Sequence, residues 1–101
     1  MENYNLQTSI DVCKKAWETF GKLSQMRQTQ EECAELIVAI NHHLRCRDKH
    51  LDETSEEMAD VLITLLQIMS GLDLFVKVDK QINKKLHKLE SKLNDTWPST
   101  K

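Results

Sequence analysis

The chain has 101 residues, 40% of them hydrophobic, so it is long enough for one domain with a modest core and too short for several. Its net charge of −2 argues against a general nucleic-acid binder, because neutralising phosphates requires an excess of basic residues. Only two glycines and one proline interrupt a sequence rich in helix-forming residues, and this composition predicts an all-α fold.

Neither a disulfide framework nor a membrane segment is expected. The cysteines, Cys13, Cys33 and Cys46, are odd in number, lack a C-x-x-C spacing and fall in helical patterns, which favours a reducing environment. The N-terminus has no basic start followed by an apolar run, and no stretch reaches the ~18 to 20 apolar residues that span a bilayer. We therefore expect a cytoplasmic protein with no membrane partner and no stable nucleic-acid partner.

Helical spacing of apolar residues predicts a first helix from about Leu6 to Phe20, with Gly21 as its C-cap. The apolar positions of this helix are Ile10, Cys13, Trp17 and Phe20. A second helix is expected from about Ser24 to Arg45. It carries apolar residues on one side, at Met26, Cys33, Leu36, Ile37, Ile40 and Leu44, and acids at Glu31, Glu32 and Glu35.

The polar stretch CRDKHLDET, residues 46–54, predicts a connection, with Asp52 or Thr54 as the N-cap of a third helix. This helix is expected to run to about Ser70 and to stop at Gly71. Apolar residues lie nearly all round it, at Val61, Leu62, Ile63, Leu65, Leu66, Ile68 and Met69. One neighbouring surface cannot cover such a helix, so we expect a second chain to cover the rest, in a homodimer or a dimer-based homotetramer.

A fourth helix is expected from about Val76 to Leu93, with an apolar stripe at Ile82, Leu86, Leu89 and Leu93. Lysines occupy most of its remaining surface, at Lys77, Lys80, Lys84, Lys85, Lys88 and Lys92. Charge is therefore unevenly spread, with 12 acids and 7 bases in residues 1–60 and 4 acids and 7 bases in residues 61–101. The expected fold is a four-helix bundle-like single domain over residues 1–101, with residues 95–101 as a loose C-terminal tail.

Two acid blocks, EECAE at 31–35 and EEMAD at 56–60, repeat one pattern on consecutive helices. Each residue turns an α-helix by about 100°, so acids three positions apart share one face. An antiparallel hairpin can bring Glu32 and Glu35 opposite Glu57 and Asp60. A turn symmetric about residues 46–50 would leave the two pairs roughly 7 Å out of level, and a loop that folds back would remove this offset.

Four converging carboxylates repel one another, and a divalent cation removes the conflict. Oxygen ligands without Cys or His favour a hard ion, Mg²⁺ or in its place Mn²⁺, which also binds substrate phosphates. A carboxylate-bridged di-iron site is disfavoured, because it needs Glu-x-x-His on two helices and none occurs. The alternative is a solvated acidic face, in which Glu57 is the capping-box partner of Thr54.

These blocks resemble those of the MazG-like all-α nucleoside triphosphate pyrophosphohydrolases, a group related to dCTP pyrophosphatases and dimeric dUTPases. The resemblance spans about Trp17 to Leu93 and is centred on EECAEL and EEMADVLITLLQIMSGLDL, while KQINKK is similar to the phosphate-binding segment of the family. It implies hydrolysis of a nucleoside triphosphate to the monophosphate and pyrophosphate, in a nucleotide-pool housekeeping role.

The resemblance also implies roles for individual residues. The Mg²⁺ ligands would be Glu32, Glu35, Glu57 and Asp60, and Glu31 and Glu56 would orient or deprotonate the attacking water. The phosphates would be contacted by Lys80, Asn83, Lys84 and Lys85. Trp17 either stacks on the base or packs in the core, and Lys22 and Gln25 precede the first acid block within reach of a substrate.

Two other functions fit the same sequence. One is a non-catalytic helical interaction or scaffold protein, whose acid blocks are solvated or only bind a cation. The other is a nucleotide-binding regulator with weak catalysis. Steady-state turnover of nucleoside triphosphates separates the enzyme from both.

Overall fold

The computed structural model of the protein describes residues 3–46 and 51–96, and within these ranges it contains four α-helices and no strand. The helices are α1 (Leu6–Phe20), α2 (Lys22–Cys46), α3 (Leu51–Leu72) and α4 (Phe75–Thr96). The predicted all-α fold is confirmed. Of the predicted tail at 95–101, Asp95 and Thr96 belong to α4, and the rest lies outside the described residues.

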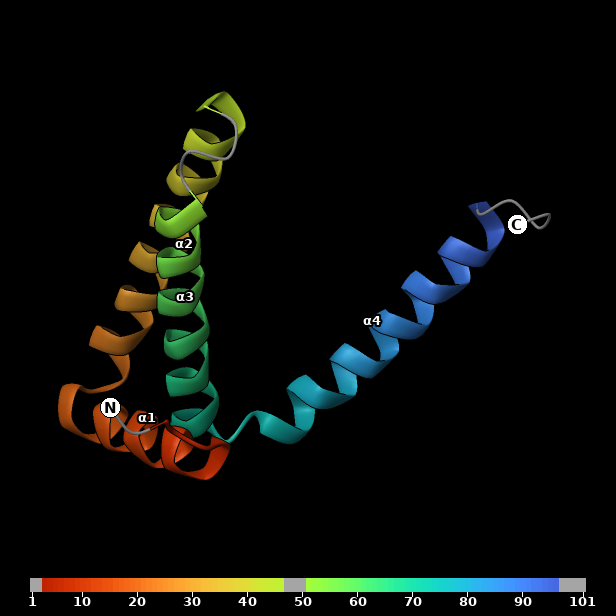
Figure 1. The fold of residues 1–101 in the computed structure, drawn as a ribbon. Coiled ribbons are helices and arrows are strands. Elements are labelled where there is room, and N and C mark those ends of the chain that lie inside the picture. Colours follow the sequence, from red (N-terminus) through yellow and green to blue (C-terminus); the bar gives the residue numbers. More distant parts are fainter. Residues whose placement is uncertain (1–2, 47–50, 97–101) are drawn as a thin grey trace.

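Helices α2 and α3 form an antiparallel hairpin, and α1 lies across its base (Figure 1). Helix α1 begins at Asn5, whose side chain accepts a hydrogen bond of 2.8 Å from the backbone N–H of Thr8. It ends at Gly21, which has a φ of 88° and donates its N–H to the carbonyl of Trp17, as the sequence predicts. This tight turn between α1 and α2 places α1 against the C-terminal half of α3.

The expected ends of α3 were both wrong. Helix α3 begins at Leu51, so Asp52 and Thr54 lie inside it rather than at its N-cap. Gly71 also lies inside α3, where a Cβ atom would overlap the ring of Trp17. The helix ends at Leu72, followed by Asp73 at a φ of 53° and by a hydrogen bond from Leu74 N–H to Met69 O. Gly71 therefore allows close packing of α1 on α3, and it does not terminate the helix.

The face that α2 buries is polar. Its buried residues are Gln25, Thr29, Glu32 and Ala39, whereas Ile37 and Leu44 on the apolar side are 61% and 71% exposed. The only hydrophobic residues buried in the described chain are Cys13 and Ala39. A single chain thus leaves most of its apolar surface uncovered, which is unusual for a globular domain.

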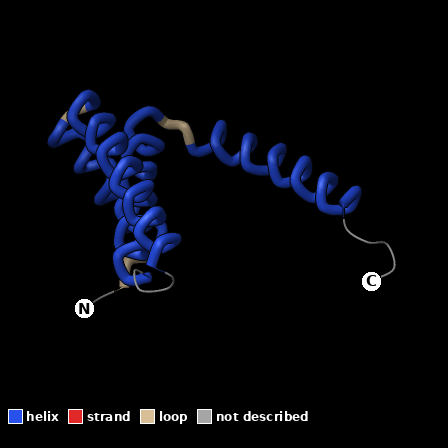
Figure 2. Tube along the Cα trace, turned by 90° about the horizontal axis from the view of Figure 1, so that it is seen from above, coloured by secondary structure: helices blue, strands red, loops and turns tan. Residues whose placement is uncertain are grey.

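Helix α4 leads away from the other three helices and has no extended packing interface with any of them (Figures 1 and 2). None of its residues is buried. The radius of gyration is 17.2 Å, against about 13 Å for a compact domain of 100 residues. The packed unit within one chain is therefore α1–α3, and the predicted bundle is not closed by the chain's own fourth helix.

No helix in residues 3–46 and 51–96 is both long and apolar enough to cross a membrane.

Candidate functional site

The structure brings four of the predicted acids together across the α2–α3 hairpin. Glu32 and Glu35 on α2 and Glu57 and Asp60 on α3 each offer one carboxylate oxygen, and these oxygens all lie within 4.8 Å of one another. The roughly 7 Å offset expected of a symmetric turn therefore does not keep the two pairs of acids apart. Nearer the turn, the side chain of His42, near the end of α2, pairs with that of Glu53 in the first turn of α3, with Nδ1 and Oε1 3.0 Å apart.

Two of these carboxyl groups sit in unfavourable surroundings. Burial raises the pKa of Glu32, the nearby Glu35 and Asp60 raise it further, and a hydrogen bond from Gln28 opposes the rise. Burial also raises the pKa of Glu57, with repulsion from Glu35, Asp60 and Glu32 adding to it. Gln28 Nε2 donates to Glu32 Oε1 at 2.8 Å, while the Oε2 atoms of Glu32 and Glu57 are buried without a hydrogen-bond partner.

This arrangement fits a hard divalent cation. Unpartnered buried carboxylate oxygens that repel one another are stabilised by a shared positive charge. Oxygen ligands of a single Mg²⁺ lie about 3 to 4 Å apart, so side-chain rotations are sufficient for this cluster to hold an ion. The four-carboxylate donor set, without Cys or His, favours Mg²⁺ or Mn²⁺ over softer metals.

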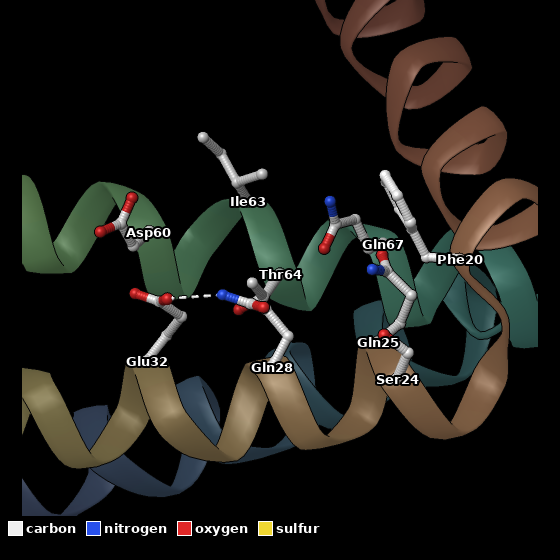
Figure 3. Close-up of a pocket in the computed structure, with 9 residues that line it drawn as sticks. All are labelled: Phe20, Ser24, Gln25, Gln28, Glu32, Asp60, Ile63, Thr64 and Gln67. Carbon is white, nitrogen blue, oxygen red and sulfur yellow. Dashed lines mark hydrogen bonds between the residues drawn. The ribbon is translucent and has the colours of Figure 1, made fainter.

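A cavity of about 350 Å³ adjoins the acids between α2 and α3 (Figure 3). Glu32 and Asp60 lie at its border, and the other lining residues are Phe20, Ser24, Gln25, Gln28, Ile63, Thr64 and Gln67. Of these, Gln25 was predicted from the sequence to lie within reach of a substrate, whereas Gln28, Thr64 and Gln67 were not predicted. Helical spacing could have identified them, because residues four and seven positions apart share one face of a helix. Gln25 and Gln28 precede Glu32 by seven and four residues, and Thr64 and Gln67 follow Asp60 by four and seven.

The other predicted site residues lie elsewhere in the chain. Glu31 and Glu56 are exposed and are not among the four clustered acids. The basic and amide side chains of α4, namely Lys80, Asn83, Lys84 and Lys85, lie on the helix that leads away from the hairpin. Trp17 packs on Gly71 and does not line the cavity beside the acids.

The comparisons with known proteins identify one relationship. A family model described as the MazG nucleotide pyrophosphohydrolase domain matches residues 20–97. The comparisons with curated proteins and with solved structures gave no match. The matched range begins at the last residue of α1 and contains all four clustered acids, the adjoining cavity and α4.

Proposed function

Because the chain belongs to the MazG nucleotide pyrophosphohydrolase family, we propose that it hydrolyses ribo- or deoxyribonucleoside triphosphates to the monophosphate and pyrophosphate. The observation that carries the proposal is the meeting of four carboxylates from two helices beside a cavity. A solvated acidic face would spread these charges apart in water, whereas here two carboxylate oxygens are buried without partners. The physiological role that we propose is nucleotide-pool housekeeping.

The residues that would hold Mg²⁺, or Mn²⁺ in its place, are Glu32, Glu35, Glu57 and Asp60. When bound, the cation neutralises triphosphate charge and lowers the pKa of a coordinated water. Gln28 fixes the Glu32 carboxylate by hydrogen bonding to one of its oxygens, so that the other oxygen remains available. The hairpin itself supplies rigidity, since each acid lies on a long helix rather than on a loop.

Hydrolysis of the α–β linkage adds water to one phosphoryl group and releases pyrophosphate from the monophosphate. The water gives up a proton as it attacks, and we propose Glu31 or Glu56 as the acceptor. Each of these acids precedes a cluster member by one residue and is exposed, which leaves its carboxylate accessible to a substrate at the mouth of the site. The lysines and Asn83 of α4 would stabilise charge on the leaving pyrophosphate.

We propose that this α4 belongs to a second copy of the chain, in a homodimer or a dimer-based homotetramer. Helix α4 has an apolar stripe and a basic surface but no extended packing interface in its own chain. The hairpin has the complementary properties: it carries the acid cluster, it exposes Leu62 of α3 to 62%, and it has an apolar hollow lined by Met26, Cys33, Ile37 and Ile68. Covering the apolar stripes and pairing opposite charges both favour association.

The experiment that tests the function is a panel of ribo- and deoxyribonucleoside triphosphates incubated with the protein and Mg²⁺, with pyrophosphate and orthophosphate assayed separately. We expect pyrophosphate and the monophosphate from at least one substrate. Absence of pyrophosphate from every substrate contradicts the proposal. So does pyrophosphate release that Glu35→Gln and Asp60→Asn leave unchanged.

A further inference from the structure

One side of helix α2 carries a stripe of apolar residues that its own chain leaves uncovered. The large side chains of this α2 stripe are between 36% and 71% exposed, and they are Leu23, Met26, Ile37, Ile40 and Leu44. Gln30, Cys33 and Ala34 complete the stripe at helical spacing, so none of its members carries a charge. Together with Ile68 of α3, part of the stripe lines a hollow of about 680 Å³.

This hollow and the cavity beside the acids open on opposite sides of the hairpin. Ser24 and Gln28 of α2 line the cavity. Met26 and Cys33, which line the hollow, lie about 140 to 180° away from them round the same helix. A helix whose lysines reach the acids cannot also fill the hollow. The hollow therefore needs an occupant other than helix α4 of a second copy.

We propose that the α2 stripe docks on the α2 stripe of a second copy of the chain, with the two helices antiparallel and a two-fold axis between Cys33 and Ala34. The inference deepens the association proposed above by naming its surface, and it does not depend on the hydrolytic reaction. This contact and that of α4 join the same two chains, so the loss of either should separate them. The acid cavity stays accessible, because it opens on the other side of the hairpin.

The order of side chains along the stripe fits a two-fold contact. Helix α2 spans residues 22–46, so Cys33 and Ala34, the smallest members of the stripe, lie at its middle. Antiparallel pairing about this point sets Leu23 against the partner's Leu44. Small residues at a crossing point let two helix axes approach to about 8 Å, and the large residues towards either end then fill the space between the helices.

The exposed apolar surface is large enough for a stable pair of chains. On α3, Met58, Leu65 and Leu72 are 37% to 48% exposed and lie within about 80° of Ile68 round the helix. Covering these three side chains and the five large ones of the α2 stripe removes roughly 400 Å² of apolar surface per chain from water. That area is close to the apolar share of the ~800 Å² that each partner buries in an interface of standard size.

The small core of one chain favours a second copy over another kind of partner. In residues 3–46 and 51–96, Cys13 and Ala39 are the only buried hydrophobic residues. The packed unit α1–α3 therefore needs another surface to complete its core, and a copy of the same chain is present wherever the chain is made. A lipid surface favours basic residues along an apolar stripe, whereas the outer flank of the α2 stripe carries Arg27 and Glu31, of opposite charge.

The cysteines of α2 allow a direct test, because Cys33 and Cys46 are both exposed. With axes about 8 Å apart, the Cα atoms of the two copies of Cys33 lie within the ~4.4 to 6.8 Å that a disulfide spans. The two copies of Cys46 lie about 37 Å apart in the same arrangement. Diamide, which takes up the two hydrogen atoms that the thiols lose, should therefore convert the purified protein to a disulfide-linked dimer on a non-reducing gel.

The two cysteines also provide matched variants. We expect Cys33→Ser to lower the cross-linked fraction at least about 10-fold and Cys46→Ser to leave it unchanged. Absence of a linked dimer, or a linked dimer that Cys33→Ser leaves intact, overturns the inference.

A charge in the hollow gives a second test. Two-fold symmetry places the charge of Ile37→Glu twice in an apolar contact, so the dissociation constant of the pair, measured by analytical ultracentrifugation, should rise at least about 100-fold. Val12→Glu is the matched control, because Val12 is an exposed apolar residue of α1, and it should leave association unchanged.

Unchanged association of the Ile37→Glu protein overturns the inference, and if this variant does not fold, the cross-linking result decides. A pair of chains that is linked through Cys33 but releases no pyrophosphate supports the interface and contradicts the proposed function alone.

Discussion

The α2–α3 hairpin and helix α4 differ in how much packing each has within its own chain. The hairpin closes on itself, buries a polar face and gathers four acids within 4.8 Å of one another. No residue of helix α4 is buried, although the helix has a regular apolar stripe. The difference is the basis of our proposal that the acid site is complete in one chain, while the basic surface that would serve it comes from a second chain.

The largest effect should come from a substitution in the acid cluster of the α2–α3 hairpin. We expect Asp60→Asn to lower pyrophosphate release by at least about 100-fold, because it removes one of four negatively charged oxygens that would hold the cation. Steady-state assays at several Mg²⁺ concentrations measure the change. Glu18→Gln is the control, since Glu18 is an exposed acid of α1 outside the cluster, and its activity should match the unaltered protein.

Substitutions on the apolar stripe of α4 should reduce both the association of the chains and the rate of turnover. Leu86→Asp combined with Leu89→Asp places charge on the apolar stripe, and we expect a monomer by light scattering with activity lowered by about 10-fold or more. Ser91→Asp adds one negative charge, half that of the double variant, on the opposite face of α4 and should leave both properties unchanged. A monomeric but fully active Leu86/Leu89 variant would show that α4 of a second chain does not serve the site.

Mixing two inactive variants tests directly whether one site is built from two chains. Asp60→Asn removes one acid of the cluster but leaves α4 unchanged. The double variant Asn83→Ala with Lys84→Ala removes two proposed phosphate-binding side chains of α4 but leaves the acids unchanged. In a dimer with shared sites, random exchange of equal amounts should restore about a quarter of the original activity, because half of the dimers then carry one complete site. Activity that stays at the level of the separate variants contradicts a site shared between chains.

The same two regions mark how far the sequence predicts the fold. Apolar spacing and helix-forming composition were sufficient for four helices, and the cap at Gly21 was correct because glycine alone readily adopts its φ of 88°. The repeated acid blocks predicted the cluster, since spacing of three residues and an antiparallel hairpin determine it. By contrast, the polar face that α2 buries was not evident, because hydrophobic periodicity favours a side that lies about 90° round the helix from it. The departure of α4 from the other three helices was not predicted either, since an apolar stripe does not specify what it packs against.

Packing at the base of the hairpin should respond to a single methyl group. Gly71→Ala is expected to lower the free energy of unfolding by about 1 to 2 kcal/mol, because the added Cβ overlaps the Trp17 ring. Denaturant unfolding measures this loss. In a Trp17→Leu background the penalty should shrink or reverse, since alanine is favoured over glycine in a helix by about 1 kcal/mol. An equal loss in both backgrounds would show that the ring contact is not its cause.

The smallest effect concerns the burial and the mutual repulsion of the carboxylates in the acid cluster. Because the pKa of Glu57 is raised from 4.5, the folded protein holds more protons than the unfolded chain, so the stability contributed by this group falls as pH rises above about 4.5. Without metal, Glu57→Gln should therefore melt a few degrees above the unaltered protein at pH 7, with the difference shrinking towards pH 4.5. The control Glu18→Gln should show no such trend.

Millimolar Mg²⁺ should reverse this order, because only the unaltered protein retains all four carboxylates and gains the full stabilisation of cation binding. A Glu57→Gln protein that melts at the same temperature as the unaltered one in both conditions would place Glu57 in ordinary solvated surroundings. The acid blocks would then be a solvated helix face, and the hairpin alone, like α4 alone, would not form a metal site.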